Sequence, residues 1–183
     1  MINKAEFEDI KKDLLSFEEK REEVIALSRT IIQLSKKIIY AVHRTDMDKA
    51  KSLIPEITKK VKLLPEKNYD TGMANVAKQE YVEALTFFEF VKSGKIPGRK
   101  TLDVSSDQYL LGMCDLTGEI VRFGVNQAVK NNKKETEKAK NSVEEIYGQF
   151  LELDLRNGEL RKKSDQIKYN LLRLEEVVYN LKK

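Results

Sequence analysis

The fold is decided by the stretch YLLGMCDLTGEIVRFGVNQAV at residues 109–129. Most of its positions are apolar or small, yet polar side chains recur at spacings of four, three and four residues, at Asp115, Glu119, Arg122 and Asn126. Side chains at these spacings share one face of an α-helix. Because the rest of the helix is too apolar to lie in water, the stretch predicts a buried helix whose polar face borders a cavity or cleft.

Amphipathic patterns on both sides of this stretch predict helices along the whole chain. Three-four spacing of apolar residues indicates helices over residues 5–43, about 46–64, 71–92, 107–130, 139–153 and 160–181. The helix at 71–92 is apolar on nearly all sides, which predicts a central position. The last helix carries a heptad seam suited to pairing with another helix. The fold class is therefore all-α, a bundle with long N- and C-terminal helices.

Composition agrees with a single helical domain over residues 1–183. The chain is 35% charged and 40% hydrophobic, with three prolines and eight glycines, and its formal net charge of +4 suits nucleic acid without requiring it. The only cysteine, Cys114, excludes an intramolecular disulfide and fits a reducing compartment. No apolar run approaches the roughly 20 residues that span a bilayer, so we expect a cytoplasmic protein without a membrane segment.

A second acidic pair lies on the predicted central helix. Glu80 and Glu83 are three residues apart there, so two separate helices each present two carboxylates, with Asp115 and Glu119 on the other. Oxygen ligands without nearby Cys or His favour a hard cation, Mg²⁺ or alternatively Mn²⁺. Such a cation beside a phosphodiester supports hydrolysis.

The same acids also fit a purely structural network, and the pattern leaves both interpretations open. In that case Arg122 would neutralise Glu119 and Lys78 would serve Glu83. The only histidine, His43, ends the first helix, where we expect an ordinary surface residue. A di-iron site, which uses Glu-x-x-His pairs, therefore fits poorly.

Cationic residues gather in runs outside the acidic pattern. The loop at residues 93–100 supplies Lys95, Arg99 and Lys100, which with Arg122 are candidate nucleic-acid contacts. No aromatic residues interleave with these runs to stack on bases. Gly112 and Gly118 are small enough to permit close helix contact.

Several motifs resemble the translin superfamily. QEYVEA at residues 79–84, DQYLLG at 107–112 and DLTGE at 115–119 are similar to its translin-associated factor X branch. LRKK at 160–163, IKY at 167–169 and LEEVVY at 174–179 are similar to its translin branch. The resemblance extends from the first helix to the end of the chain. The segment at 70–75 departs from it, because it lacks the basic, histidine-bearing sequence of the translin branch.

The resemblance implies a bundle of about seven antiparallel helices that assembles into hollow octamers. It also implies a Mg²⁺-dependent endoribonuclease site facing the interior and acting on short RNA. Carried over residue by residue, the catalytic and metal-binding acids fall on Glu80, Glu83, Asp115 and Glu119. The compact chain is expected to be an archaeal-type member that assembles with itself.

Three functions follow as hypotheses. The first is a factor X-like endoribonuclease. The second is a non-catalytic shell that binds RNA or single-stranded DNA. The third is a structural coiled-coil protein that binds a partner helix, and the acidic stripe counts against it.

Overall fold

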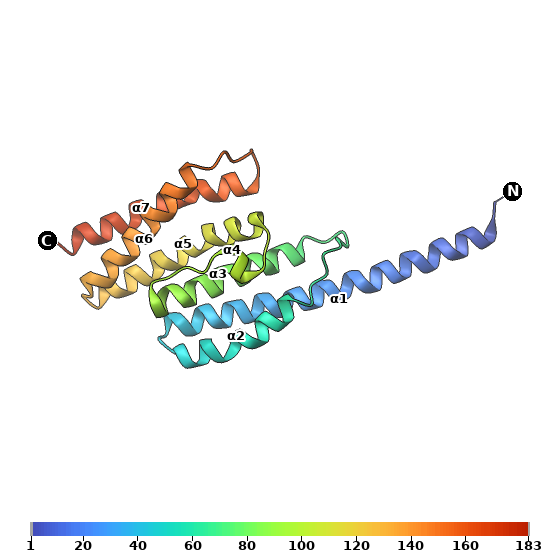
Figure 1. Ribbon diagram of the computed structural model, residues 1–183, viewed down its shortest axis with the longest axis horizontal. Coiled ribbons are helices and arrows are strands. Elements are labelled where there is room, and N and C mark those ends of the chain that lie inside the picture. The colour runs from blue at the N-terminus through green and yellow to red at the C-terminus, as the bar shows by residue number, and fades with distance from the viewer. Residues whose placement is uncertain (1, 183) are drawn as a thin grey trace.

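The computed structural model describes residues 2–182, which form seven helices and no strand (Figure 1). The helices are α1 (Lys4–His43), α2 (Met47–Val61), α3 (Met73–Ser93), α4 (Arg99–Leu102), α5 (Ser106–Val129), α6 (Lys133–Leu151) and α7 (Glu159–Asn180). The predicted all-α class with about seven helices is confirmed. Only the four-residue helix α4, which overlaps the end of the loop predicted at residues 93–100, had no periodic signal in the sequence.

Four of the helices, α1, α3, α5 and α7, run in the same direction (Figure 1). For α3 and α5, contacts at both ends demonstrate this: Gln108 donates to Asn75 near their starts at 2.9 Å, and the rings of Phe90 and Phe123 meet near their ends at 5.8 Å. The chain returns through α2, through the connector at residues 94–105 that carries α4, and through α6. Antiparallel packing, expected for the whole bundle, therefore holds between successive helices such as α1 and α2, and the connector makes α3 and α5 parallel.

The core lies on both sides of α3, which packs against α1, α2 and α5. Its central position agrees with the nearly all-round apolar pattern. Large side chains with no exposure come from every long helix, among them Ile31, Ile57, Phe87, Leu116, Val143 and Ile167. No helix within residues 2–182 has both the length and the apolar character needed to cross a membrane.

The start of α5 is set by a capping box. The Ser105 hydroxyl accepts a hydrogen bond from the Gln108 backbone N–H at 3.3 Å, and the Gln108 side chain accepts one from the Ser105 N–H at 3.0 Å. These bonds satisfy backbone donors that a helix start leaves free. The cap therefore defines where α5 begins, and with it the height of Asp115 and Glu119 along the helix axis.

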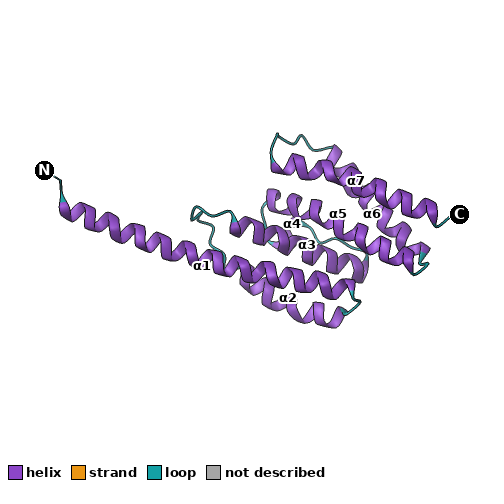
Figure 2. Cartoon of the chain, turned by 180° about the vertical axis from the view of Figure 1, so that it is seen from behind, coloured by secondary structure: helices purple, strands orange, loops and turns teal. Residues whose placement is uncertain are grey.

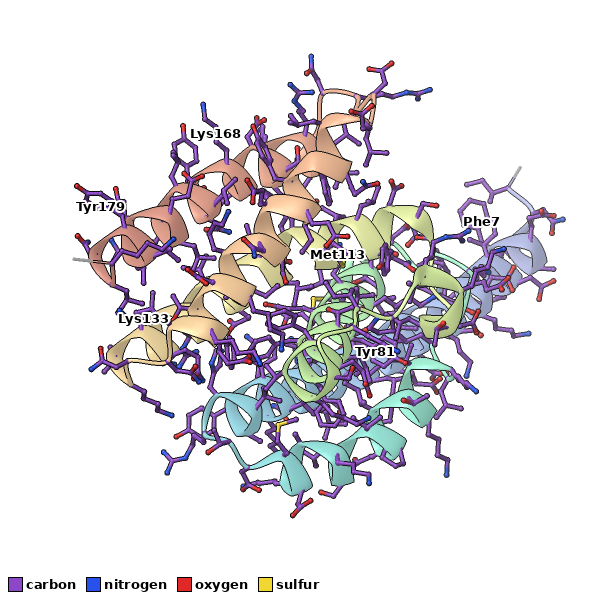
Figure 3. The ribbon with its side chains drawn as sticks, turned by 60° about the vertical axis from the view of Figure 1, so that its left-hand side comes forward. Phe7, Tyr81, Met113, Lys133, Lys168 and Tyr179 are labelled. Carbon is purple, nitrogen blue, oxygen red and sulfur yellow. The ribbon has the colours of Figure 1, made fainter. Side chains whose placement is uncertain are left out.

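The N-terminal part of α1 projects beyond the bundle (Figures 1 and 2). Apolar spacing continues along it, but burial begins only at Val24. Phe7, Ile10 and Leu14 are exposed. In Figure 3 Phe7 lies out on this projection, whereas Met113 lies within the body of the molecule. The stripe of apolar residues is thus present as predicted but is left uncovered by this chain.

The contact between α3 and α5 depends on the missing side chain at Gly112. A Cβ atom there would lie 2.7 Å from the Val82 Cβ and 2.8 Å from the Gln79 carbonyl oxygen. Gly118, expected to serve the same purpose, has nothing within 4 Å of its Cβ position. Of the two glycines, only Gly112 permits close approach of the helices.

We predict that Gly112→Ala destabilises the protein by about 1–3 kcal/mol, because the new methyl group must push α3 away from α5. Gly118→Ala is the matched control on the same helix, and we expect it to be neutral or to stabilise by up to about 1 kcal/mol through helix propensity. Denaturant unfolding of both variants measures the difference. Equal stability of the two would contradict the close contact at Gly112.

Candidate functional site

An acidic cleft lies where α1, α3 and α5 meet. Its cavity has a volume of about 340 Å³. The residues that line it are Lys36, Ile39, Tyr40, Glu80, Glu83, Glu119 and Arg122. The structure therefore brings three of the four predicted acids to one place, and it adds α1, which the sequence patterns had not assigned to the site.

Asp115, the fourth acid, is ion-paired to α7. The Lys163 Nζ donates to both of its carboxylate oxygens, at 2.9 and 2.6 Å. Burial alone would lower the pKa of Lys163, but the hydrogen bond to Asp115 and its charge outweigh burial, and the pKa is raised. Lys163 is thus held as a cation at the edge of the acidic cluster. The sequence spacing gave no sign of this partner, because Lys163 and Asp115 are 48 residues apart.

Glu80 and Glu83 have no such partner. Neither carboxylate receives a hydrogen bond or forms an ion pair with any residue in the range 2–182. Burial raises the pKa of Glu80, with the charge of Lys36 opposing the rise and that of Asp115 adding to it. Burial, followed by the charges of Asp115 and Glu80, raises the pKa of Glu83 to about 8. Glu80 and Glu83 are therefore the two carboxyl groups of the cleft whose ionised form the fold does not compensate.

His43 is part of this site, and the expectation of an ordinary surface residue was wrong. Its side chain is 4% exposed, its Nε2 contacts the Glu119 carboxylate, and its ring packs on Phe87 at 4.7 Å between centroids. Its Nδ1 is buried without a hydrogen-bond partner. His43 follows Lys36 by seven residues and so shares its face of α1, but this spacing points to the site only once α1 is known to line the cleft.

The structural network proposed as an alternative is only partly present. The Arg122 guanidinium lies 3.9 Å from the Glu119 carboxylate, so that pair exists. Lys78, however, lines a different cavity together with Thr101 and Leu102 of the connector. Residues two apart on a helix project about 200° from each other, so Lys78 points away from Glu80. It does not neutralise the acids of the cleft.

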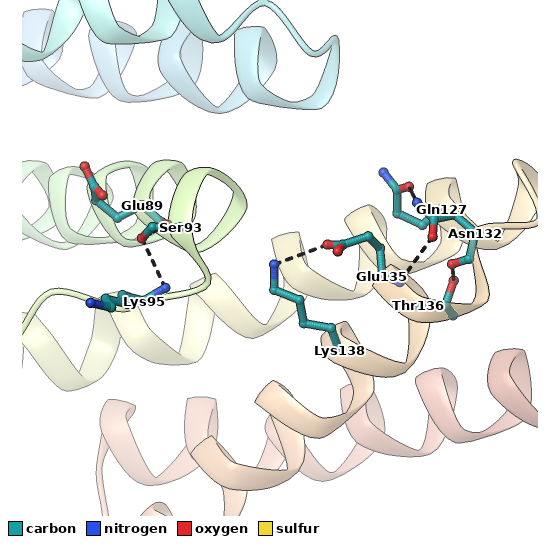
Figure 4. Close-up of polar contacts among 8 residues, drawn as sticks. All are labelled: Glu89, Ser93, Lys95, Gln127, Asn132, Glu135, Thr136 and Lys138. Atoms are coloured by element: carbon teal, nitrogen blue, oxygen red, sulfur yellow. Dashed lines mark hydrogen bonds and ion pairs between the residues drawn. The ribbon is translucent and has the colours of Figure 1, made fainter.

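The predicted nucleic-acid contacts Lys95, Arg99 and Lys100 lie on the connector, away from the acids. Its Pro97 carbonyl accepts a hydrogen bond from the Tyr109 hydroxyl at 3.1 Å. At the end of α3 the Lys95 backbone N–H donates to the Ser93 hydroxyl at 3.3 Å (Figure 4). The connector packs on the sides of α3 and α5 that face away from the cleft, so of the four predicted contacts only Arg122 borders it.

The chemistry of the cluster suits a hard cation. Four carboxylates from α3 and α5 interact electrostatically. Burial, and after it the repulsion from the other acids, raises the pKa of Glu83, and a cation of charge two would relieve that repulsion. Cys114 offers no thiolate, because burial raises its pKa to about 12. Within residues 2–182, no three Asp, Glu, His or Cys side chains are yet arranged to hold a metal ion. Carboxylate oxygens are the type of ligand that a hard divalent cation prefers, but these side chains would have to move to gather around one.

A protein-family model and curated relatives both match most of the chain. A model of the translin family matches residues 19–182. An uncharacterized protein of Methanocaldococcus jannaschii is 34% identical over 156 residues, covering 79% of this chain and 68% of the relative. The translin-associated protein X homolog of Schizosaccharomyces pombe is 32% identical over 145 residues, covering 68% of this chain and 63% of the relative. The chain thus spans less than two thirds of the length of the S. pombe relative.

Solved structures are similar over almost the whole chain. The crystal structure of apo-NeC3PO has a TM-score of 0.89 at 31% identity and covers 96% of each chain. A complex of AfC3PO with duplex RNA has a TM-score of 0.78 at 26% identity, covering 97% of this chain and 96% of the other.

We predict that Glu83 makes folding stability fall as pH rises. In the folded protein it keeps its proton up to about pH 8, against an ordinary pKa of 4.5, so the folded state binds more protons between these values. Glu83→Gln removes this dependence. In EDTA at pH 8 the variant should be more stable by about 1–3 kcal/mol, since one pKa unit corresponds to about 1.4 kcal/mol.

Thermal unfolding across this pH range measures the effect. Near pH 4.5 the variant and the wild type should be similarly stable. If both proteins lose stability equally as the pH rises, Glu83 does not carry the raised pKa.

Proposed function

The chain belongs to the translin family, and we propose that it is a metal-dependent endoribonuclease acting on short RNA. The observation that carries the proposal is the state of Glu80 and Glu83, two half-buried carboxylates without a partner beside two further acids. When all of its members are ionised, a cluster of this kind is unfavourable unless a cation joins it. The factor X resemblance of the same residues gives the reaction type.

In this proposal the protein's own groups have separate tasks. Glu80, Glu83, Asp115 and Glu119 would hold Mg²⁺, with Mn²⁺ as an alternative. When bound, the cation would stabilise charge on the phosphodiester oxygens and activate water. Arg122, at the border of the cleft, would steady the phosphate of the RNA.

Lys163 and His43 would position two of the acids. Lys163 donates to both oxygens of Asp115, and His43 contacts Glu119, so neither carboxylate is free to rotate without losing a partner. A cation that binds Asp115 must share it with Lys163. This competition predicts that the cluster needs a substantial Mg²⁺ concentration to fill.

A non-catalytic shell that binds RNA or single-stranded DNA is the second candidate. It is favoured by one observation, that no three candidate ligands within residues 2–182 are arranged for a metal ion. A solved relative complexed with duplex RNA agrees with either function. Under both proposals Lys95, Arg99 and Lys100 would meet nucleic acid only at a second surface, away from the acidic cleft.

We predict that Glu80→Gln and Asp115→Asn each reduce RNA cleavage in Mg²⁺ by at least about 100-fold, the loss typical when charge stabilisation at a reaction centre is removed. Both variants should still bind RNA in EDTA, because the acids do not attract phosphate. Cleavage of labelled short RNA with and without Mg²⁺ or Mn²⁺ is the measurement. Glu89→Gln, on α3 beside Lys92, is the matched control and should cleave normally.

Two results would change the proposal. Full cleavage by Glu80→Gln would show that the centre lies elsewhere. Binding of RNA by the wild type without cleavage in either cation would favour the non-catalytic shell.

We also propose that the protein is a homo-oligomer. The exposed residues Phe7, Ile10 and Leu14 continue the apolar stripe of α1 beyond the bundle, and single apolar stripes on projecting helices mark interaction surfaces. The number eight for the assembly comes from the family resemblance.

We predict that Leu14→Glu shifts the protein to a smaller assembly, because a charge in an apolar seam costs a few kcal/mol per contact. Leu14 is 65% exposed in the single chain. Leu63, which is 62% exposed and lies outside the stripe, provides the control Leu63→Glu. Light scattering after size-exclusion chromatography measures both masses. An unchanged mass for Leu14→Glu would exclude this part of α1 from the interface.

A further inference from the structure

One face of α1 beside the acidic cleft carries exposed polar and aromatic side chains at helical spacing. Its members are separated by four, three, four and four residues, and are Arg29, Gln33, Lys36, Tyr40 and Arg44. We propose that this face, the α1 strip, binds a single strand of RNA and leads it into the cleft. The proposal rests on RNA as the substrate, and it names the surface that recognises it.

The position of the strip is fixed by two residues that belong to both surfaces. Lys36 and Tyr40 line the cavity with Glu80, Glu83 and Glu119. On the same helix, His43 is turned inward to Glu119. A strand lying along the strip would therefore pass the acids directly. The strip from Arg29 to Arg44 is about 22 Å long at the rise of an α-helix, which is enough for several nucleotides.

Charge is the first reason for assigning RNA to this face. Four carboxylates repel a phosphate backbone, so a strand can approach them only where cations lie next to them. Arg29 and Lys36 are exposed, and neither forms an ion pair with another residue in the described range 2–182, although the charge of Lys36 acts at longer range on Glu80. Cations that the fold leaves unpaired are available to phosphates, whose counterions are released on binding.

Tyr40 is the second reason, because it supplies the aromatic surface that the other cationic runs lack. Tyr40 is 57% exposed and lines the rim of the cavity. The Arg44 guanidinium lies 5.6 Å from the ring centroid and donates to the Tyr40 hydroxyl at 3.3 Å, which orients the ring. An oriented, exposed ring between cations is a stacking platform for a base, and it tolerates any base because every base has a π-face.

The test measures RNA binding separately from cleavage. Fluorescence anisotropy of a labelled short oligouridylate in EDTA reports binding to the full-length protein with no divalent cation present. We expect Tyr40→Ala to raise Kd about 5- to 150-fold, the effect of losing one base stack. Tyr40→Phe keeps the ring and should restore most of the affinity.

The cations have a distinct signature. Lys36→Ala and Arg29→Ala should each weaken binding and lower the slope of log Kd against log salt concentration by about 0.7, the value for one phosphate contact on a single strand. Lys59→Ala, which removes an exposed charge from α2, is the matched control and should leave both quantities unchanged.

The outcomes separate this proposal from the nuclease proposal. If Tyr40→Ala and Lys36→Ala bind RNA with the wild-type Kd and keep their helical content by circular dichroism, the α1 strip is not the binding surface. That conclusion holds even if the protein cleaves RNA. Absence of binding by the wild type also overturns it, as does binding of duplex RNA alone without dependence on Tyr40. If the variants behave as expected and no cleavage occurs in any divalent cation, the strip stands and the nuclease proposal fails.

Discussion

Mutual repulsion among four carboxylates is the constraint around which this bundle is arranged. Glu80 and Glu83 on α3 lie within electrostatic reach of Asp115 and Glu119 on α5, and burial strengthens every one of these interactions. The flanking helices offset part of the repulsion. α7 brings the ammonium of Lys163 to Asp115, and α1 brings Lys36 and His43 to the opposite side.

In this arrangement the helices that meet at the site, α1, α3, α5 and α7, run in one direction (Figure 1). Lys36 therefore lies at the same height along the bundle as Glu80, His43 at the height of Glu119, and Lys163 at the height of Asp115. Parallel helices keep these heights matched because each helix rises by the same distance per residue. The connector at residues 94–105 makes the parallel pairing of α3 and α5 possible. It covers their apolar sides with Leu102 and Val104, both buried, and leaves the acidic sides facing α1 and α7.

The sequence predicted those features that belong to a single helix. Periodicity located the long helices, and the polar stripe in an apolar helix identified Asp115 and Glu119, because both signals depend only on spacing along the chain. The partners of the acids could not be predicted from the sequence, because Lys163 and Asp115 are 48 residues apart and meet only after α7 packs on α5. The same limit explains the two glycines, which are equally small in sequence, although only Gly112 faces another helix.

The pairing of the acids bears on whether the cluster is structural or functional. A structural network is stable only when each buried charge has a partner, since an unpaired one costs more than the whole network contributes. Here Asp115 and Glu119 have partners within the chain, whereas Glu80 and Glu83 have none among residues 2–182. The fold thus holds two acids in place and leaves two that need a positive charge nearby whenever they are ionised. That division is expected of a site whose remaining charge is supplied by a bound cation, and a network evolved for stability alone would have paired or replaced the two remaining acids.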